Sequence, residues 1–408
     1  MLLLAPLTCV VALGVSPPST IDKPHLHGIF LDLTPVTAQW TEAEWKQDLQ
    51  SMVDIGLTFF VIHHTATGSN EITKECPLGN YTAYFPVHAP CFSQMGSDES
   101  GGSIGVILRA AKSVGLRVHL GLAAQKHLTT ADGKNALYVN ATVLGKFREL
   151  QSDIARELWY QFASMDIIDG FYTYIEQPQN YASFLPYWLV QAKTYLQPLG
   201  HYIKHELPNL TSYHPQGMKP HPRGMNKRPL AVWSSPDAVG NWTRYSRPAM
   251  IGPRLYADLW EQMFINAPDF DHTAQQDAIG GGGNSIETAA FFLDNLSAAS
   301  ARQQRTQWAN VELFRTWPPS CQWSEGHPCT GRAPASITRI LNQIVSAAHV
   351  LSRGNLSMSG QSVLIAWEWT SCLSPHGGDA HDRNGNISNI TRENFLAYKE
   401  YLNTNVSV

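Results

Sequence analysis

The 408-residue sequence has little charge and no long hydrophobic run, and each shortage excludes a class of protein. Charged residues make up 15% of it, the formal net charge is −4, and like charges do not gather in runs. The charge of this chain therefore gives no electrostatic reason to expect a nucleic acid or an anionic membrane surface as a partner. No stretch reaches the roughly 20 apolar residues of a spanning helix. The hydrophobic share of 43% is nevertheless enough for a large core, which excludes a disordered chain.

The first apolar run, Leu2–Val15, suits the core of a secretory signal peptide, and a signal anchor is the weaker alternative. Small residues near Ser16 offer a cleavage point, so we predict a signal peptide over 1–16 and a secreted mature chain. Asn-x-Ser/Thr triplets support export, because such sites are glycosylated only in the secretory pathway. They begin at Asn80, Asn140, Asn209, Asn241, Asn295, Asn355, Asn386, Asn389 and Asn405.

Five cysteines remain once Cys9 leaves with the signal peptide. In an oxidising compartment, the two pairs that are close in sequence would each close one loop, while Cys372 is left over. The alternative is that all five are small buried hydrophobic residues. The two predicted disulfides are Cys76–Cys91 and Cys321–Cys329.

No internal repeat and no low-complexity linker divides the chain, which favours one domain over 21–408. Short β-branched or aromatic runs predict eight strands, at 28–33, 58–63, 117–122, 168–176, 230–234, 270–277, 306–314 and 362–369. Amphipathic segments lie between them. One begins at Thr41, whose side chain can cap a helix while Glu44 reaches back, and the others are at 103–114, 143–165, 183–206, 254–266, 286–299, 335–351 and 391–402. This alternation predicts the α/β class and a single (β/α)8 TIM-type barrel.

An open doubly wound sheet is the second choice of architecture. It would usually carry a glycine-rich turn after its first strand, where this chain has Leu33-Thr34-Pro35. In the barrel, long loops at 64–102 and 207–228 would wall a cleft at the carboxyl ends of the strands, where the active site of such a barrel lies.

Two carboxylates are the strongest chemical signal at these strand ends. Glu176 closes the fourth predicted strand and Glu312 the seventh, so a barrel would place them across its mouth. Strict alternation along each strand would point Glu176 the same way as Tyr172 and Tyr174. Two carboxylates about 5–5.5 Å apart suit a retaining glycosidase, whereas about 6.5–9.5 Å suits an inverting one. Alternatively, each glutamate is a solvated residue or a member of a structural ion pair.

The motifs around these residues are similar to the family known as domain of unknown function 4434, which is related to the retaining β/α-barrel glycosidases. They are Gly28-Ile29-Phe30-Leu31-Asp32, Trp40-Thr41-x-x-Glu44-Trp45, Gly170-Phe171-Tyr172, Gln276-Asp277-x-x-Gly280 and Trp308-Ala309-Asn310-Val311-Glu312. The resemblance implies that Glu176 is the acid/base and Glu312 the nucleophile. In the wider clan an Asn precedes the acid/base, whereas Ile175 stands there in this chain.

Further polar and aromatic residues at the strand ends are candidates for substrate binding. Aromatic rings could stack on sugars, although such rings more often fill a barrel core, and the polar groups could bind hydroxyls. Asn310 could reach the sugar 2-hydroxyl that the missing Asn would contact. The candidates are Asp32, Tyr172, Tyr174, Gln275, Asp277, Trp308, Asn310 and Trp367.

Other functions are weaker by these criteria. A metal-dependent hydrolase is suggested by His25-x-His27, His63-His64 and His119, but adjacent histidines on a strand should point to opposite faces. No Gly-x-Ser-x-Gly turn supports a serine nucleophile. A secreted sugar-binding barrel without catalysis is the non-enzymatic alternative. We therefore expect a monomeric, secreted glycoside hydrolase that uses neither metal nor cofactor.

Overall fold

The computed structural model describes residues 23–69, 75–87, 91–97, 99–125, 140–177, 190–207, 230–234, 272–276, 298, 302, 306–315, 333–353, 363–370, 372–376 and 387–404. Within these residues, no helix has the length and apolar character needed to cross a membrane. The predicted helices at 254–266 and 286–299 lie outside the described residues, apart from Ala298.

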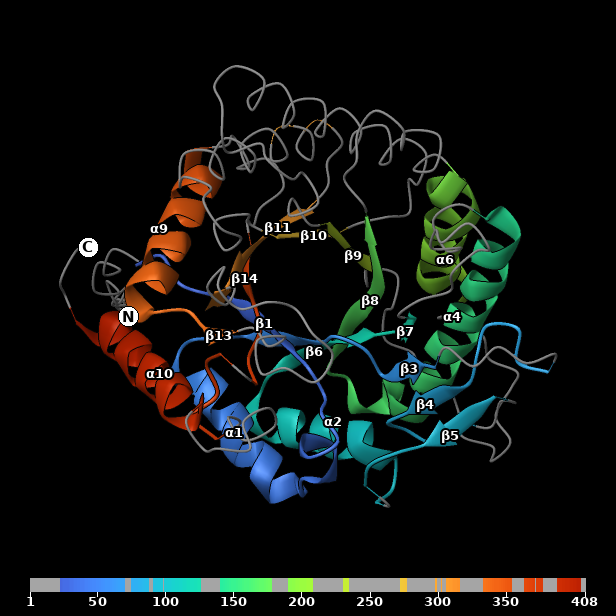
Figure 1. Cartoon of the computed structure of the whole chain (residues 1–408), viewed down its shortest axis with the longest axis horizontal. Helices are drawn as coiled ribbons and strands as arrows, with labels where there is room; N and C mark the ends of the chain where they lie inside the picture. Colours follow the sequence, from blue (N-terminus) through green and yellow to red (C-terminus); the bar gives the residue numbers. More distant parts are fainter. Residues whose placement is uncertain are drawn as a thin grey trace, which may run out of the picture.

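Eight parallel strands form the centre of the molecule, and each pairs with two others (Figure 1). Their order around the closed sheet is β1-β14-β11-β10-β9-β8-β6-β2. Strands of this sheet that follow one another along the chain are therefore neighbours, and the last strand, β14, pairs with the first, β1. All eight predicted strands are confirmed, together with the α/β class. The strands are β1 (Gly28–Leu31), β2 (Phe59–Ile62), β6 (Arg117–Gly121), β8 (Ile168–Gln177), β9 (Leu230–Ser234), β10 (His272–Gln276), β11 (Thr306–Glu312) and β14 (Val363–Trp367).

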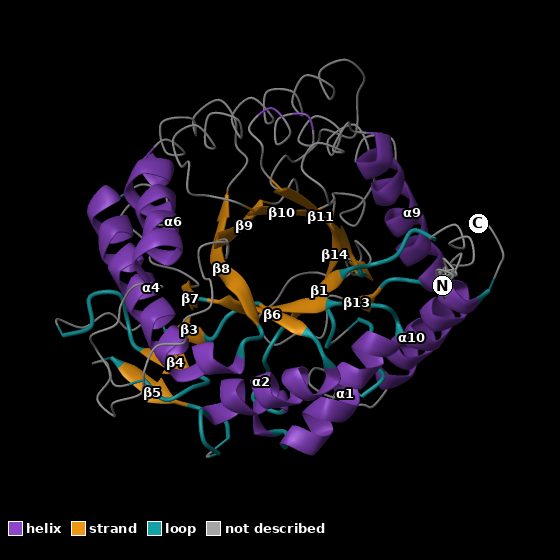
Figure 2. Ribbon diagram, turned by 180° about the vertical axis from the view of Figure 1, so that it is seen from behind, coloured by secondary structure: helices purple, strands orange, loops and turns teal. Residues whose placement is uncertain are grey.

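Helices lie outside the strand ring, as Figure 2 shows from behind. The apolar faces of these helices cover the sheet, so the core lies both inside the ring and between ring and helices. The helical segments are α1 (Glu42–Asp54), α2 (Gly102–Val114), α4 (Ala141–Phe162), η3 (Ala192–Leu196), α6 (Gln197–His201), η4 (Tyr202–Glu206), α9 (Ile337–Arg353) and α10 (Ile387–Asn403), with single 3-10 turns η1 (Thr37–Gln39) and η2 (Ala163–Met165).

The start of α1 confirms the predicted capping signal. The Thr41 hydroxyl accepts a hydrogen bond from the Glu44 backbone N–H, and the Glu44 carboxylate accepts one from the Thr41 backbone N–H at 2.8 Å. This reciprocal pair satisfies two backbone donors that the first helical turn leaves open. The Glu44 carboxylate accepts hydrogen bonds from the Thr41 backbone N–H and from the Thr41 hydroxyl, and these two bonds lower the pKa of Glu44.

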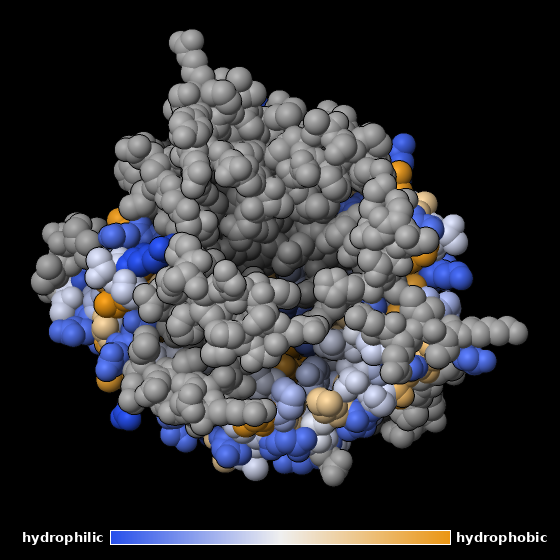
Figure 3. Space-filling view, viewed as in Figure 1, coloured by the Kyte–Doolittle hydropathy of each residue, from blue (hydrophilic) through white to orange (hydrophobic). Residues whose placement is uncertain are grey.

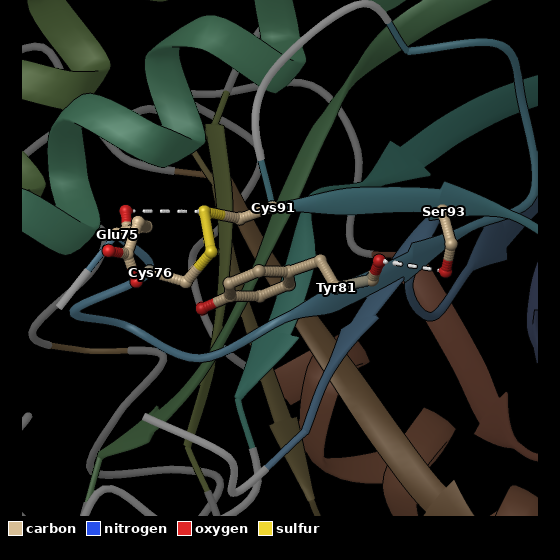
Figure 4. The surroundings of a disulfide bond; sticks show 5 residues. All are labelled: Glu75, Cys76, Tyr81, Cys91 and Ser93. Carbon is tan, nitrogen blue, oxygen red and sulfur yellow. Dashed lines mark hydrogen bonds between the residues drawn. A yellow bond between two sulfur atoms is a disulfide. The ribbon is translucent and has the colours of Figure 1, made fainter. Parts of the chain in front are cut away.

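A small four-stranded sheet occupies part of the expected loop 64–102 and was not predicted. Its order is β5-β4-β3-β7, with β3 continuing the chain shortly after β2 and β7 shortly after β6. The predicted disulfide Cys76–Cys91 is present beside it, and Tyr81 lies close by (Figure 4). Cys372 is buried, and Cys321 and Cys329 lie outside the described residues. The short strands are β3 (Ala66–Gly68), β4 (Tyr81–Ala83), β5 (Phe92–Gln94) and β7 (Ala123–Gln125), and a separate hairpin joins β12 (Phe314–Arg315) to β13 (Ala333–Pro334).

The surface of the described residues is mostly hydrophilic on the face that Figure 3 shows, with apolar residues scattered between. The exposed large hydrophobic residues in the described ranges are far apart in sequence: Val36, Met95, Val190 and Leu396. Single exposed hydrophobic residues of this kind are ordinary for a globular protein.

A buried carboxyl group ties α1 to the segment that follows β14. Asp48, 1% exposed, accepts hydrogen bonds from Trp369 Nε1 at 2.7 Å and from the Ser374 hydroxyl at 2.6 Å. Burial raises the pKa of Asp48 above its ordinary value, against the lowering effect of these two hydrogen bonds and of His376. These hydrogen bonds therefore attach the segment after β14 to α1, and they keep the titratable Asp48 carboxyl group inside the protein.

We expect Asp48→Asn to change how the free energy of unfolding depends on pH. The raised pKa means that the folded state keeps this proton where the unfolded state loses it. The stability from Asp48 is therefore complete below the unfolded pKa and is lost as pH rises through the folded pKa. The variant lacks this loss, so its stability relative to wild type should increase as pH rises from the unfolded pKa of about 4 to the raised folded pKa, by about 1.4 kcal/mol per unit of raised pKa.

Urea unfolding over this pH range measures the difference, and Asp54→Asn is the matched control on the same helix. Asp54 lies at the surface, and its hydrogen bonds from Lys399 and Gln50 lower its pKa. That stability is present above the unfolded pKa and is lost as pH falls through the folded pKa, so the control should show a small effect of opposite sign. A pH-independent difference between Asp48→Asn and wild type would contradict the prediction.

Candidate active site at the carboxyl ends of the strands

The strand order brings the two predicted catalytic positions to the same end of the sheet. Glu176 lies near the end of β8, the fourth strand, and Glu312 is the last residue of β11, the seventh. The strands β9 and β10 lie between them. The backbone therefore has the predicted spacing of three strands around a ring of eight.

Several predicted site residues are described only by their backbone or not at all. The side chains of Tyr174, Glu176, Gln275 and Glu312 lie outside the described part, and so does the whole of Asp277. In the register of β10 and β11, Gln275 pairs with Ala309, and Gln276 is the partner of Asn310. The roles of these residues stay predictions.

The strand β8 has an irregularity in its pairing next to Glu176. Thr173 pairs with Val232 of β9, but the next pair joins Gln177 to Ser234, so β8 has two more residues than β9 over this stretch. Such a bulge can interrupt the regular alternation of side chains. The shared direction of Tyr172, Tyr174 and Glu176 therefore stays a prediction.

Aromatic rings fill the inside of the ring in two groups. In the lower group, Trp308 lies 4.9 Å from His119 and 5.3 Å from Phe59, measured between ring centroids. Trp308 is only 2% exposed and Tyr172 is fully buried, which places both in the core of the barrel. Their predicted contact with substrate stays untested, but burial and ring packing account for both residues.

The upper group of rings lies toward the carboxyl ends of the strands. The Trp367 ring lies 4.2 Å from His63 in an edge-on arrangement and 5.1 Å from Phe30. Phe30 in turn lies 5.1 Å from Tyr172. Trp367 is 7% exposed and ends β14 as the register partner of Glu312. Its side chain thus borders the position where Glu312 leaves the sheet.

Asn310 is a polar group inside the barrel. It is fully buried, and neither its amide nitrogen nor its amide oxygen has a hydrogen-bond partner in the part of the chain that the structure describes. Since side chains alternate along β11, which pairs regularly on both sides, Asn310 faces the interior as Trp308 does, one step nearer the mouth. Leaving a buried amide unpaired costs about 1–3 kcal/mol, so this group is suited to a polar ligand.

Asp32, His63 and His64 form a cluster that the alternation argument missed. His63 Nδ1 lies 2.7 Å and His64 Nδ1 4.0 Å from Asp32 Oδ1. We expected the two histidines to point to opposite faces, and this is wrong. The strand β2 ends at Ile62, so both histidines lie beyond it, where alternation no longer applies. The positions of these residues at the ends of adjacent strands were the signal that could have predicted the cluster.

The chain matches the model of one protein family over most of its length. The model of the family described as a domain of unknown function, DUF4434, matches residues 26–353, which is most of the chain. The chain belongs to the DUF4434 family. A search of curated protein sequences finds no match to this DUF4434 protein.

Structure comparison gives the fold relatives of this DUF4434 protein. A candidate α-L-fucosidase from Bacteroides thetaiotaomicron is 15% identical, with a TM-score of 0.60 over 94% of this chain and 96% of that chain. A β-galactosidase from Marinomonas ef1 is 12% identical, with a TM-score of 0.45 over 92% of this chain and 59% of that chain. At these identities the comparison supports the fold alone, and the first relative carries that support.

Proposed function

We propose that this DUF4434 protein is a glycoside hydrolase of the TIM-barrel type that cleaves O-glycosidic bonds of a polysaccharide or glycoconjugate. The observation that carries the proposal is the strand order, which gives one glutamate to the fourth strand and one to the seventh at the same end of the ring. The fold similarity to a candidate fucosidase supports a sugar as substrate.

In the proposed retaining mechanism, Glu176 protonates the glycosidic oxygen while the Glu312 carboxylate attacks the anomeric carbon. The bond to the leaving group breaks as the bond to Glu312 forms. Water then attacks the same carbon, Glu176 takes its proton, and Glu312 is released. For Glu176 to hold a proton near neutral pH its pKa must be high, which repulsion by ionised Glu312 would supply. A bell-shaped pH profile is the consequence.

Asn310 is the substrate-binding residue with the strongest structural support. Its buried amide lies two residues before Glu312 and has both a donor and an acceptor to offer to a sugar hydroxyl. Trp367 borders the same position and provides an aromatic edge. We propose that these two residues contact the sugar that Glu312 attacks.

We also propose that the protein is exported, which agrees with this substrate class. The Cys76–Cys91 disulfide is typical of an oxidising compartment, and the predicted signal peptide and sequons agree with one. An exported glycosidase would act on carbohydrate outside the cell.

A reducing-sugar screen over diverse polysaccharides, with aryl glycosides in parallel, tests the proposal. Release of reducing ends by wild type, and none by a Glu176→Ala/Glu312→Gln double variant, is the expected result. Binding of a glycan without turnover across the panel would instead favour a sugar-binding barrel without catalysis.

Replacing Asn310 by Ala should lower activity without lowering stability. Loss of a hydrogen bond to the sugar should reduce kcat/KM by about 10- to 100-fold, while removal of an unpaired buried amide should leave the free energy of unfolding equal or higher. Asn394→Ala is the matched control, because the Asn394 amide donates to the Ala335 carbonyl at 2.9 Å. That control should lose about 1 kcal/mol of stability and keep its kcat/KM. The opposite pattern would remove Asn310 from the site.

A further inference from the structure

Three potential metal ligands come together from the ends of two adjacent strands. Asp32 follows the last residue of β1, and His63 and His64 follow the last residue of β2. The two strands are parallel, and their final residues, Leu31 and Ile62, are register partners. The backbone thus delivers one carboxylate and two imidazoles to one point at the mouth of the barrel.

The distances within this cluster suit one shared ion. One ligand atom from each residue lies within 4.8 Å of the other two. The shortest separation, 2.7 Å between His63 Nδ1 and Asp32 Oδ1, is a hydrogen bond, so an ion would take the place of the proton between these atoms. A bound Zn²⁺ sits about 2.0–2.2 Å from each nitrogen or oxygen ligand, so the Asp32 and His63 atoms would move apart and the His64 ligand atom would move closer to them.

Backbone hydrogen bonds fix the chain at Asp32 and His63, and a neighbouring ring packs against His63. The His63 backbone N–H donates to the Leu31 carbonyl at 3.0 Å, and the Thr370 hydroxyl donates to the Asp32 carbonyl at 3.1 Å. The His63 ring packs against Trp367, as described above. Ligands that are oriented by their surroundings in this way lose little freedom when they bind an ion.

The cluster is also accessible. The side chain of Asp32 is 32% exposed, whereas those of His63 and His64 are 9% and 14% exposed. An ion can therefore reach the site through Asp32 and be enclosed by the imidazoles. Two imidazole nitrogens and one carboxylate oxygen form a donor set that suits Zn²⁺ better than Mg²⁺ or Ca²⁺, which prefer oxygen ligands. Three protein ligands leave a fourth position for water or a ligand oxygen.

We propose that Asp32, His63 and His64 bind one divalent transition-metal cation, with Zn²⁺ the best fit to the donor set. This site goes beyond the proposed hydrolase function and does not depend on it, because neither Glu176 nor Glu312 takes part. It also assigns Asp32 a role in metal binding besides the substrate contact predicted from its strand end.

Zinc titration of the full mature chain tests the site. Protein freed of metal by dialysis against EDTA is titrated with ZnCl₂ by calorimetry, and bound zinc is counted by elemental analysis after gel filtration. We expect one equivalent per chain. His64→Asn and Asp32→Asn should each weaken binding by about tenfold or more, because each removes one ligand.

The exposed pair His201 and His205 provides the matched control. Their ring centroids lie 4.9 Å apart on one helical face, so this pair could bind zinc at the surface without any built site. A His201→Asn/His205→Asn variant should keep the affinity of wild type. If zinc binding is lost in this variant and unchanged in His64→Asn, or if wild type retains no zinc, the proposal is overturned.

Thermal unfolding separates loss of a ligand from loss of the fold. A cation that binds only the folded state raises Tm. Zinc should raise the Tm of wild type and of the His201/His205 variant, and at the same zinc concentration it should raise the Tm of a cooperatively unfolding His64→Asn variant by a smaller amount. A zinc-dependent Tm shift in His64→Asn equal to that of wild type would contradict the site. None of these measurements depends on hydrolysis. The metal site and the hydrolase activity can therefore be confirmed or rejected independently of each other.

Discussion

Replacing Glu312 by Gln is expected to lower kcat by about 10⁴-fold or more on a substrate found in the glycan screen. Loss of a nucleophile in an enzyme that forms a covalent intermediate has effects of this order. The amide has nearly the shape of the carboxylate, but it is a poor nucleophile and carries no negative charge to stabilise the positive anomeric carbon. Steady-state hydrolysis of a polysaccharide, with the cooperative unfolding of the variant as a check, measures the effect.

A second carboxylate at the same end of the ring makes this test specific. Glu368 follows Trp367, the register partner of Glu312, and is 5% exposed. If Glu312 is the nucleophile, Glu368→Gln should retain far more activity than Glu312→Gln. Wild-type-like turnover by Glu312→Gln would remove it from the mechanism, and a loss confined to Glu368→Gln would transfer the role to the eighth strand.

The regular parts of the barrel could be predicted because their sequence signals are local and repeated. The β2 run of Phe59–Ile62 is a continuous buried apolar stretch, as expected for a parallel strand covered on both faces. At α1, the Thr41 and Glu44 side chains mark the helix start by chemistry that is independent of tertiary contacts. Counting such signals around the chain gives eight strands, and the count itself indicates the ring.

The small sheet could not be predicted by the same means. Its strands have three residues each, such as Ala66–Gly68, and three residues are too few to show alternation. The partners β3 and β7 are far apart in sequence and are brought together by the adjacent strands β2 and β6. The pairing is thus a consequence of the pairing of β2 with β6 rather than of the local sequence.

The strand ends that carry the candidate residues could be predicted, whereas the direction of the side chains beyond them could not. The alternation rule failed at His63 and His64, which lie beyond the end of β2. This failure occurs where a strand changes into a loop. Function-bearing residues of a barrel are concentrated there, so the simplest geometric rule is weakest where the chemistry is located.

Replacing Glu176 by Ala should produce an effect that depends on the leaving group. Polysaccharide oxygen is a poor leaving group and needs the proton from Glu176, so kcat/KM on a polysaccharide should fall by about 10²- to 10⁴-fold. A dinitrophenyl glycoside departs without protonation, and kcat/KM, which reports the steps up to bond cleavage, should be nearly unchanged. The basic limb of the pH profile should also disappear, since it reports loss of this proton. Gln177→Ala, the neighbouring residue of β8, controls for local disturbance of the strand. Equal losses on both substrates would show that Glu176 is not the acid, whatever the fate of Glu312.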